Sequence, residues 1–216
     1  MSYQLLVFDW DGTIMDSEAH IVAAVQAAAE ECGFDVPHKD SVRRVIGLGL
    51  REAVQAVFPD FEEGKFQAFV NRYRHHFLLK STTAQAPFDG AVETLNELRQ
   101  AGFWLAVATG KGRQGLDRAM RELELESVFH TSRCADETVS KPHPRMLQEI
   151  LLDLALEPQD ALMIGDTSYD MEMAANIGMD RLAVSYGAHE IEDLEQHAPL
   201  DIIHDIRELP RWLARR

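Results

Sequence analysis

Short apolar runs that alternate with amphipathic stretches are the feature that most constrains the fold of this chain. Five such runs are predicted to be strands: residues 5–8, 104–108, 127–130, 161–164 and 181–185. The first run stops abruptly at a polar turn, which is typical of a strand buried on both faces of a parallel sheet. Helices are predicted over residues 90–100, from Pro144 to just before Pro158, and over 169–177, with Asp89 as the N-cap of the first. Strands alternating with helices predict an α/β fold with a doubly wound parallel sheet.

The region between the first two predicted strands departs from this alternation. Helices are predicted over residues 19–31, 50–58 and 61–79, and strand-like runs are nearly absent there. We therefore predict an α/β core made of residues 1–15 and 87–216, with residues 16–86 inserted as a helical cap domain. The alternative is a single α/β domain that has many early helices.

The charge of the chain limits its partners. The chain has 21 Lys and Arg and 36 Asp and Glu, which gives a formal net charge of −15. Because nucleic-acid binding depends on Lys and Arg that neutralise phosphates, a nucleic-acid partner is not expected. An anionic membrane surface is disfavoured for the same reason. A small anionic substrate would need a local device that overcomes the overall field.

The cysteines and the apolar runs bear on location. Cys32 and Cys134 are the only cysteines, and two distant cysteines in a chain of this length favour a reducing compartment, with a single disulfide as the alternative. The N-terminus carries no signal-peptide pattern, and no apolar run approaches the roughly 18 residues of a membrane helix. We expect a cytoplasmic protein with no membrane partner, and the sequence carries no signal for an oligomeric state.

Polar residues follow the ends of four predicted strands. They are Asp9 and Asp11 after the first, Thr109-Gly110-Lys111 after the second, Lys141 in the loop after the third, and Asp166 and Asp170 after the fourth. Ligands of open α/β sheets bind at the carboxyl ends of the strands, so these side chains are expected to meet at one site.

The spacing of the acids supports this expectation. Alternate residues leaving a strand point the same way, so Asp9 and Asp11 can face one site, and Gly12 permits positive φ or a close backbone approach. If a helix begins by Asp166, then Asp166 and Asp170 share one of its faces. The alternative for Asp170 is that it serves only as a helix cap.

The gathered negative charge points to a cation. Two carboxylates about 4 Å apart repel by roughly 4 kcal/mol at an effective dielectric near 20, and a phosphate dianion adds to that cost. A hard divalent cation resolves the conflict, and oxygen ligands suit Mg²⁺ better than Zn²⁺. Lys141 can supply fixed positive charge, and Thr109 can donate a hydrogen bond to a phosphate oxygen.

These motifs resemble those of the haloacid dehalogenase superfamily, in which Asp-x-Asp-Gly-Thr is followed by Thr or Ser, then Lys, then Gly-Asp-x-x-x-Asp. All four motifs occur here in that order and span essentially the whole chain. The position and helical character of the insertion resemble the subgroup with a helical cap, to which phosphoglycolate phosphatase-like enzymes belong.

The resemblance implies a phosphatase that acts on a small phosphorylated metabolite. Asp9 would be the nucleophile that forms an aspartyl-phosphate, and Asp11 would protonate the leaving oxygen and then activate water. Mg²⁺ would be held by Asp9, the backbone carbonyl of Asp11 and Asp166, with Asp170 assisting. Thr109 and Lys141 would bind the phosphoryl oxygens.

Three positions bear on the reaction and the substrate. Gly110 stands at a substrate-binding position where many relatives have Asn, which leaves no side chain to contact the substrate. The acid at Asp11 argues strongly against dehalogenation, because dehalogenating members lack it. Arg51, after Gly47-Leu48-Gly49, is a candidate for binding a substrate carboxylate or second phosphate, with a solvent-exposed Arg as the alternative.

Other functions are weighed against the phosphatase. A sugar-phosphate mutase of the same superfamily is the nearest, and His20 lies where mutases often place a His, although a surface His is the commoner explanation. A phospho-acceptor signalling domain is shorter, lacks a helical insertion and places its acidic pair before the acceptor strand. A non-catalytic binding protein is disfavoured because none of the expected reactive groups is missing. The motifs identify the chemistry, and phosphoglycolate is one candidate substrate among many.

Overall fold

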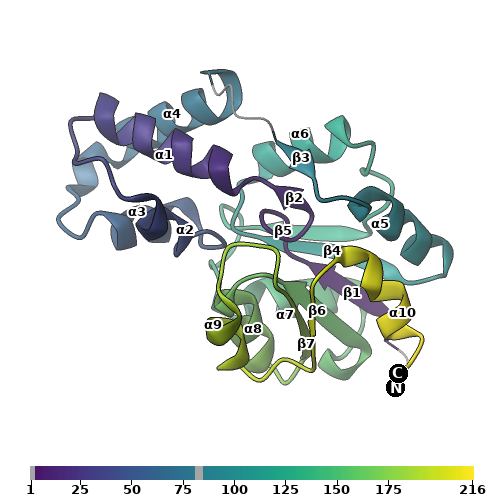
Figure 1. Ribbon diagram of the computed structural model, residues 1–216. Coiled ribbons are helices and arrows are strands. Elements are labelled where there is room, and N and C mark those ends of the chain that lie inside the picture. The colour runs from purple at the N-terminus through teal and green to yellow at the C-terminus, as the bar shows by residue number, and fades with distance from the viewer. Residues whose placement is uncertain (1–2, 81–84) are drawn as a thin grey trace.

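The computed structural model describes residues 3–80 and 85–216 and contains a six-stranded parallel sheet (Figure 1). The strand order is β5-β4-β1-β6-β7-β8. The strands are β1 (Leu5–Phe8), β4 (Trp104–Thr109), β5 (Thr131–Cys134), β6 (Ala161–Gly165), β7 (Asp180–Val184) and β8 (Ile202–Ile203). Strand β1 lies between β4 and β6 and is parallel to both, so its carboxyl end opens at the middle of the sheet.

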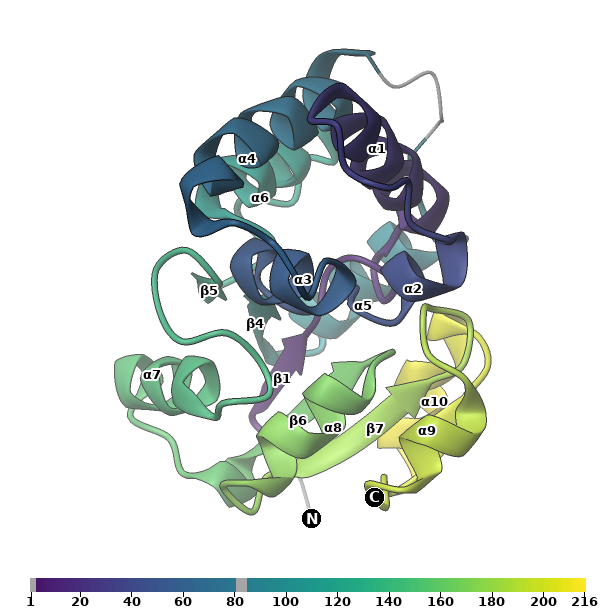
Figure 2. The same cartoon turned by 90° about the vertical axis from the view of Figure 1, so that its left-hand side faces the viewer.

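Helices cover both faces of this sheet. Leu6 and Phe8 face one apolar cluster, which includes side chains of α5 (Ala91–Gln100), α6 (Arg113–Glu122) and α10 (Leu209–Leu213). Leu5 and Val7 face the other cluster, with α7 (Arg145–Leu154) and α8 (Ser168–Ala175), which lie across the near face in Figure 2. The short helix α9 (Ile191–Glu195) packs beside α8. Because both faces are buried, β1 reads as a continuous apolar run, and the predicted doubly wound α/β fold is confirmed.

A layer of four helices lies over the carboxyl ends of the strands (Figures 1 and 2). These are α1 (Glu18–Glu31), α2 (Lys39–Arg43), α3 (Leu50–Val57) and α4 (Phe66–His75), with a 3₁₀ turn at Glu63–Lys65 and a π-helical turn at His76–Lys80. The layer has its own apolar cluster, centred on Phe69. Helix α4 is shorter than the predicted 61–79, because the chain enters it through the 3₁₀ turn and leaves it through the π-helical turn. We call α1–α4 the helical layer; the division into core and cap domains stays a prediction.

A two-stranded ribbon joins this layer to the sheet. Strand β2 (Met15–Asp16) leads out of the sheet and pairs antiparallel with β3 (Ala86–Pro87), which leads back. Both connections between the helical layer and the sheet therefore lie side by side. Within residues 3–80 and 85–216, no helix is long and apolar enough to cross a membrane.

Two local predictions are wrong. The third strand is β5 at Thr131–Cys134, and residues 127–130 form turns in which Val128 nevertheless packs into the core. The apolar residues of that segment are buried without being a strand, so the pattern misplaced it. The N-cap of α5 is Gly90, at φ 77°, rather than the exposed Asp89.

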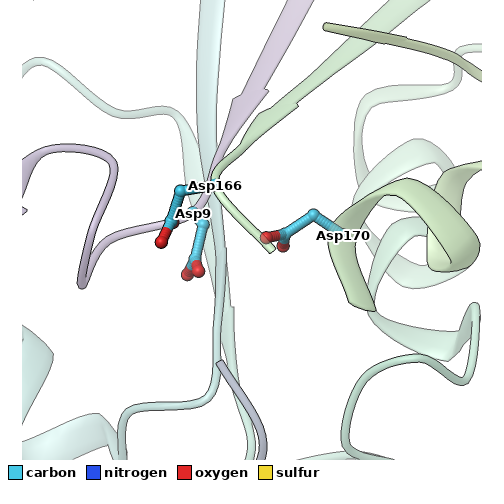
Figure 3. Close-up of side chains that lie close together, drawn as sticks. All are labelled: Asp9, Asp166 and Asp170. Atoms are coloured by element: carbon cyan, nitrogen blue, oxygen red, sulfur yellow. The ribbon is translucent and has the colours of Figure 1, made fainter. Parts of the chain in front are cut away.

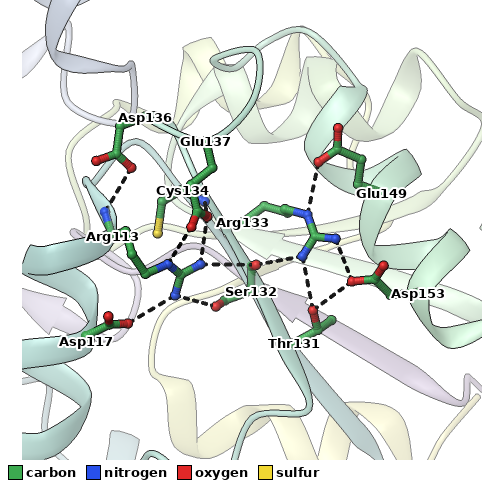
Figure 4. A network of polar contacts seen from close by, with 10 residues as sticks. All are labelled: Arg113, Asp117, Thr131, Ser132, Arg133, Cys134, Asp136, Glu137, Glu149 and Asp153. Atoms are coloured by element: carbon green, nitrogen blue, oxygen red, sulfur yellow. Dashed lines mark hydrogen bonds and ion pairs between the residues drawn. The ribbon is translucent and has the colours of Figure 1, made fainter.

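The polar character of β5 follows from its place at the edge of the sheet. Arg133 projects from the strand to Glu149 and Asp153 of α7, and Arg113 of α6 binds Glu137 just beyond the strand (Figure 4). This network of ion pairs covers the open edge with charge, which opposes pairing with a strand of another chain. Edge strands of this kind lack the apolar run by which central strands are recognised.

Candidate active site

Three carboxylates meet at the carboxyl ends of β1 and β6. Asp9 follows β1, Asp166 follows β6, and Asp170 lies in the first turn of α8. One oxygen of each lies within 4.8 Å of the others, and all three residues are buried. Figure 3 shows them converging, with Asp170 approaching from the side of α8. Residues that the sequence places 161 positions apart thus form one cluster.

Asp9 is held in place through one of its carboxylate oxygens. The backbone N–H of Trp10 donates to Asp9 Oδ1 at 2.6 Å, and Lys141 Nζ lies 2.8 Å from the same oxygen. Asp9 Oδ2 is buried and has no hydrogen-bond partner among the described residues. Burial raises the pKa of Asp9 well above its usual value, an effect that Lys141 opposes and that Asp170 and Asp166 reinforce. Oδ2 is therefore an oriented oxygen that is available to a ligand.

Lys141 is the buried cation of the cluster. Its side chain is fully enclosed, and Nζ lies 2.6 Å from Asp170 Oδ1 as well as 2.8 Å from Asp9 Oδ1. Both contacts are ion pairs by distance, although neither has the direction of a good hydrogen bond. Burial alone would lower the pKa of Lys141, but the charges of Asp170 and Asp9 outweigh it and raise the pKa. Lys141 is accordingly a fixed positive charge.

Asp166 is positioned by two donors. Thr13 Oγ1 donates to Asp166 Oδ1 at 2.8 Å, and the N–H of Ala188 donates to Oδ2 at 2.7 Å. Burial, followed by the charge of Asp170, raises the pKa of Asp166 to about 7. Gly12, at φ +88°, lies so close that a Cβ there would stand 2.1 Å from Asp166 Oδ2. Only glycine lets the loop after β1 approach the carboxylate in this way.

Asp170 has two roles in the structure. Helix α8 begins at Ser168, one residue before the predicted start, with Thr167 as its N-cap, so Asp166 lies ahead of the helix. The N–H and the hydroxyl of Thr167 both donate to Asp170 Oδ2, at 3.1 and 2.7 Å, as in a capping box. The other oxygen, Oδ1, faces Lys141. Asp170 is a helix cap and a member of the cluster at once.

Asp11 lies outside the cluster of three and faces a cavity under the helical layer. Lys111 Nζ lies 2.9 and 2.8 Å from its two carboxylate oxygens, and Ser17 Oγ donates to Oδ1 at 2.7 Å. Lys111 was expected at this edge of the sheet, but the sequence analysis gave it no role. Its position directly after Thr109-Gly110, at the end of β4, was the signal that placed it there, and its pairing with Asp11 is what the structure adds.

The residues after β4 explain a departure from the family pattern. Thr109 is buried, and its hydroxyl oxygen accepts a hydrogen bond from the N–H of Lys111 at 3.1 Å. At Gly110, a Cβ would lie 2.4 Å from the carbonyl oxygen of Leu48 and 2.5 Å from that of Gly47. The loop of the helical layer thus occupies the space that a side chain at position 110 would need.

Arg51 and His20, the two candidates from the helical layer, lie outside the cluster of three carboxylates. Arg51 lines the cavity, but its guanidinium pairs with Glu63 and lies 4.0 Å from the centre of the Phe66 ring. His20 is buried, with Nε2 2.8 Å from the carbonyl oxygen of Phe77, so its interpretation as a surface residue is wrong. The Ala-rich sequence of α1 gave no sign that its first turn is covered by the turn after α4.

Comparisons with known proteins agree with this geometry. The sequence model of the family described as haloacid dehalogenase-like hydrolase matches residues 6–184. The chain belongs to the haloacid dehalogenase-like hydrolase family, which confirms the resemblance of its motifs.

Individual relatives extend over nearly the whole chain. The chain is 31% identical over 210 residues to "Probable phosphatase IndB" of Dickeya dadantii, covering 95% of this chain and 91% of the relative. It is also 31% identical to N-acetylmuramic acid 6-phosphate phosphatase of Pseudomonas aeruginosa, over 95% of this chain and 92% of that one. The crystal structure of a predicted phosphoglycolate phosphatase from Haemophilus somnus superposes with a TM-score of 0.89 at 20% identity, covering 98% of both chains, and shows the same fold.

Proposed function

We propose that this protein hydrolyses a small phosphate monoester with the help of Mg²⁺, through an aspartyl-phosphate on Asp9. The chain is a phosphoric monoester hydrolase, in keeping with its relatives that are named phosphatases. The observation that carries the proposal is the geometry of Asp9: one oxygen is fixed by Trp10 N–H and Lys141, and the buried Oδ2 has no hydrogen-bond partner among the described residues.

The cluster fits a magnesium ion. Its ligand atoms are carboxylate oxygens that lie within 4.8 Å of one another. Two buried oxygens of the cluster, Asp9 Oδ2 and Asp170 Oδ1, have no hydrogen bond among the described residues. Asp9, Asp166 and the backbone carbonyl of Asp11 would hold the ion, while Asp170 assists directly or by orienting a ligand. The ion would supply positive charge that offsets the phosphoryl and carboxylate oxygens.

The reaction proceeds in two steps on these side chains. An Asp9 carboxylate oxygen attacks phosphorus, the bond from phosphorus to the ester oxygen breaks, and Asp11 gives a proton to the departing oxygen. Asp11 then takes a proton from water, whose oxygen attacks phosphorus, and the bond between phosphorus and Asp9 breaks to release inorganic phosphate. Lys141 and Thr109 bind the phosphoryl oxygens in both steps, where negative charge spreads.

Asp11 is oriented for proton transfer by neighbours from two loops, one after β4 and one before α1. Lys111 and Ser17 both contact its carboxylate, and the same carboxylate lines the cavity in which a leaving group would lie. A sugar-phosphate mutase of the same superfamily is the nearest alternative, and its candidate His20 has Nε2 2.8 Å from the Phe77 carbonyl oxygen. Transfer of the phosphoryl group to water is the simpler reaction and is the one proposed. The cytoplasmic location stays a prediction from the cysteines.

The experiment that tests this proposal is phosphate release from p-nitrophenyl phosphate and a panel of small monoesters, in Mg²⁺ and in EDTA. We expect turnover that depends on Mg²⁺ and is abolished in Asp9→Asn. Asp35→Asn, which changes an exposed acid outside the cavity lining, is the matched control and should retain full activity. Full activity in EDTA, or a working Asp9→Asn enzyme, would contradict the proposal.

A further inference from the structure

A large cavity separates the helical layer from the ends of the strands. Its volume is about 500 Å³, and Asp9 and Asp11 lie on its wall. A leaving group of two or three carbons would fill only a small part of it.

The wall supplied by the helical layer is mainly apolar. It includes Ile21, Val25, Ile46, Val70, Tyr73 and Phe77, which come from α1, α4 and the segments beside them. Apolar walls bind a ligand by removing apolar surface from water. They provide no partner for buried hydroxyl groups, and each hydroxyl that loses its water without a new hydrogen bond costs free energy.

Three polar side chains of the wall, Arg51, Gln67 and Lys111, are held by neighbouring residues. Arg51 pairs with Glu63, and Lys111 is bound to both oxygens of Asp11. Gln67 donates its amide to Asn71. A sugar or a short acid would have to displace these contacts to be bound by Arg51, Gln67 or Lys111, whereas an apolar ring needs none of the three.

Two aromatic side chains, Phe77 and Tyr73, lie in sequence from Asp11, the acid that we propose protonates the leaving group. Lys111 Nζ lies 2.8 Å from Asp11 Oδ2 and 4.7 Å from the centre of the Phe77 ring, which places Phe77 next to Asp11. The Tyr73 ring follows, with its centre 5.5 Å from that of Phe77 at an interplanar angle of 34°. A ring attached close to the ester oxygen would leave toward Asp11 and contact both side chains.

We propose that the substrates are phosphate monoesters whose leaving group carries an aromatic or other apolar ring close to the ester oxygen. The proposal rests on the phosphatase function given above and specifies its substrate class. The phosphoryl group is bound by the strand ends, and the ring is bound by Phe77, Tyr73 and the apolar wall.

Three primary alkyl phosphates test it, because their ester oxygens are chemically similar. Ethyl phosphate is small, glucose 6-phosphate is bulky and polar, and benzyl phosphate is bulky and apolar. We expect kcat/KM for benzyl phosphate to exceed that for each of the other two at least tenfold, with most of the difference in KM.

Variants locate the effect in the cavity. Phe77→Leu should lower the ratio of kcat/KM between benzyl and ethyl phosphate at least threefold, mainly by raising KM for benzyl phosphate. Phe58→Leu is the matched control, since Phe58 lies in the apolar cluster of the helical layer and not on the cavity wall. This variant should keep the wild-type ratio.

The outcomes separate the two proposals. Equal or better turnover of ethyl phosphate or glucose 6-phosphate would overturn the substrate class and leave the phosphatase intact. A benzyl preference that Phe77→Leu and Phe58→Leu reduce equally would also overturn it. No phosphate release from these esters or from p-nitrophenyl phosphate in Mg²⁺ would overturn the phosphatase function itself.

Discussion

Replacing Lys141 by Met tests the electrostatics of the cluster most sharply. The side chain is fully enclosed, and Nζ is within 2.8 Å of Asp9 and 2.6 Å of Asp170. Removing one partner of a buried ion pair costs about 3–5 kcal/mol, because the remaining charges are left without compensation. Against a typical total stability of about 5–15 kcal/mol, such a loss is large but leaves the protein foldable.

The measurement is urea unfolding in EDTA, with stability compared at pH 7 and pH 5. Burial already raises the pKa of Asp9, and removal of the opposing lysine raises it further. A folded-state pKa above the unfolded one means that stability falls as pH rises, so the variant should regain stability at pH 5. Addition of Asp170→Asn should restore part of the loss, because one repelling charge is removed.

Lys65→Met is the matched control, since Lys65 pairs with Glu62 at the surface, where both side chains are at least half exposed. An exposed pair contributes about 0–1 kcal/mol, so this change should have little effect. A loss below about 1 kcal/mol in Lys141→Met at pH 7, or the same loss with and without Asp170→Asn, would refute the reasoning.

Four further results are expected. Asp9→Asn should lower kcat by at least about a thousandfold. It should not lower Tm, because the negative charge that it removes is buried and repelled by Asp170 and Asp166. A residual rate of about a tenth of the wild-type rate would exclude Asp9 as the nucleophile. Gly110→Ala should lower kcat/KM about tenfold, because the new Cβ would stand 2.4 Å from the Leu48 carbonyl oxygen. Gly64→Ala, whose Cβ would have nothing within 4 Å, should leave kcat/KM unchanged. Equal effects of the two variants would contradict the close approach of the Leu48 carbonyl to Gly110. The pKa of Asp166 is raised to about 7, chiefly by burial, so below that pH protons compete with Mg²⁺ for its carboxylate. Mg²⁺ should therefore raise Tm more at pH 8 than at pH 5, and equal Tm shifts in a melting assay would contradict this competition. Calcium should support a much lower rate than magnesium, because its larger coordination shell disturbs in-line attack, and equal initial rates would exclude that explanation.

The central strands and the acids at their ends could be predicted because both follow from local rules. A strand buried on both faces, such as β1, must be apolar throughout, and parallel strands deliver the residues that follow them to one edge. Asp9 and Asp166 therefore meet although they lie far apart in the sequence. The edge strand β5 escaped prediction because its burial is partial and its side chains form ion pairs rather than a core.

Contacts between the helical layer and the sheet could not be predicted from local patterns. Nothing near His20 indicates that the Phe77 carbonyl lies against it, and nothing near Gly110 indicates that the Leu48 carbonyl lies above it. The pairing of Lys111 with Asp11 was not predicted for the same reason, since the two residues are 100 positions apart. Such pairs depend on how the two layers are set against each other, which the periodicity of either layer does not encode.

The most direct test of the account is to trap the phosphorylated residue. An acyl phosphate on a carboxylate is reduced by borohydride to an alcohol, which converts aspartate to homoserine and changes the mass of its peptide. Protein quenched during turnover of p-nitrophenyl phosphate in Mg²⁺ should carry this change at Asp9, and the change should be absent without substrate. Reduction at another residue, or an unmodified Asp9 peptide in enzyme that is turning over, would contradict a phosphoryl transfer to Asp9.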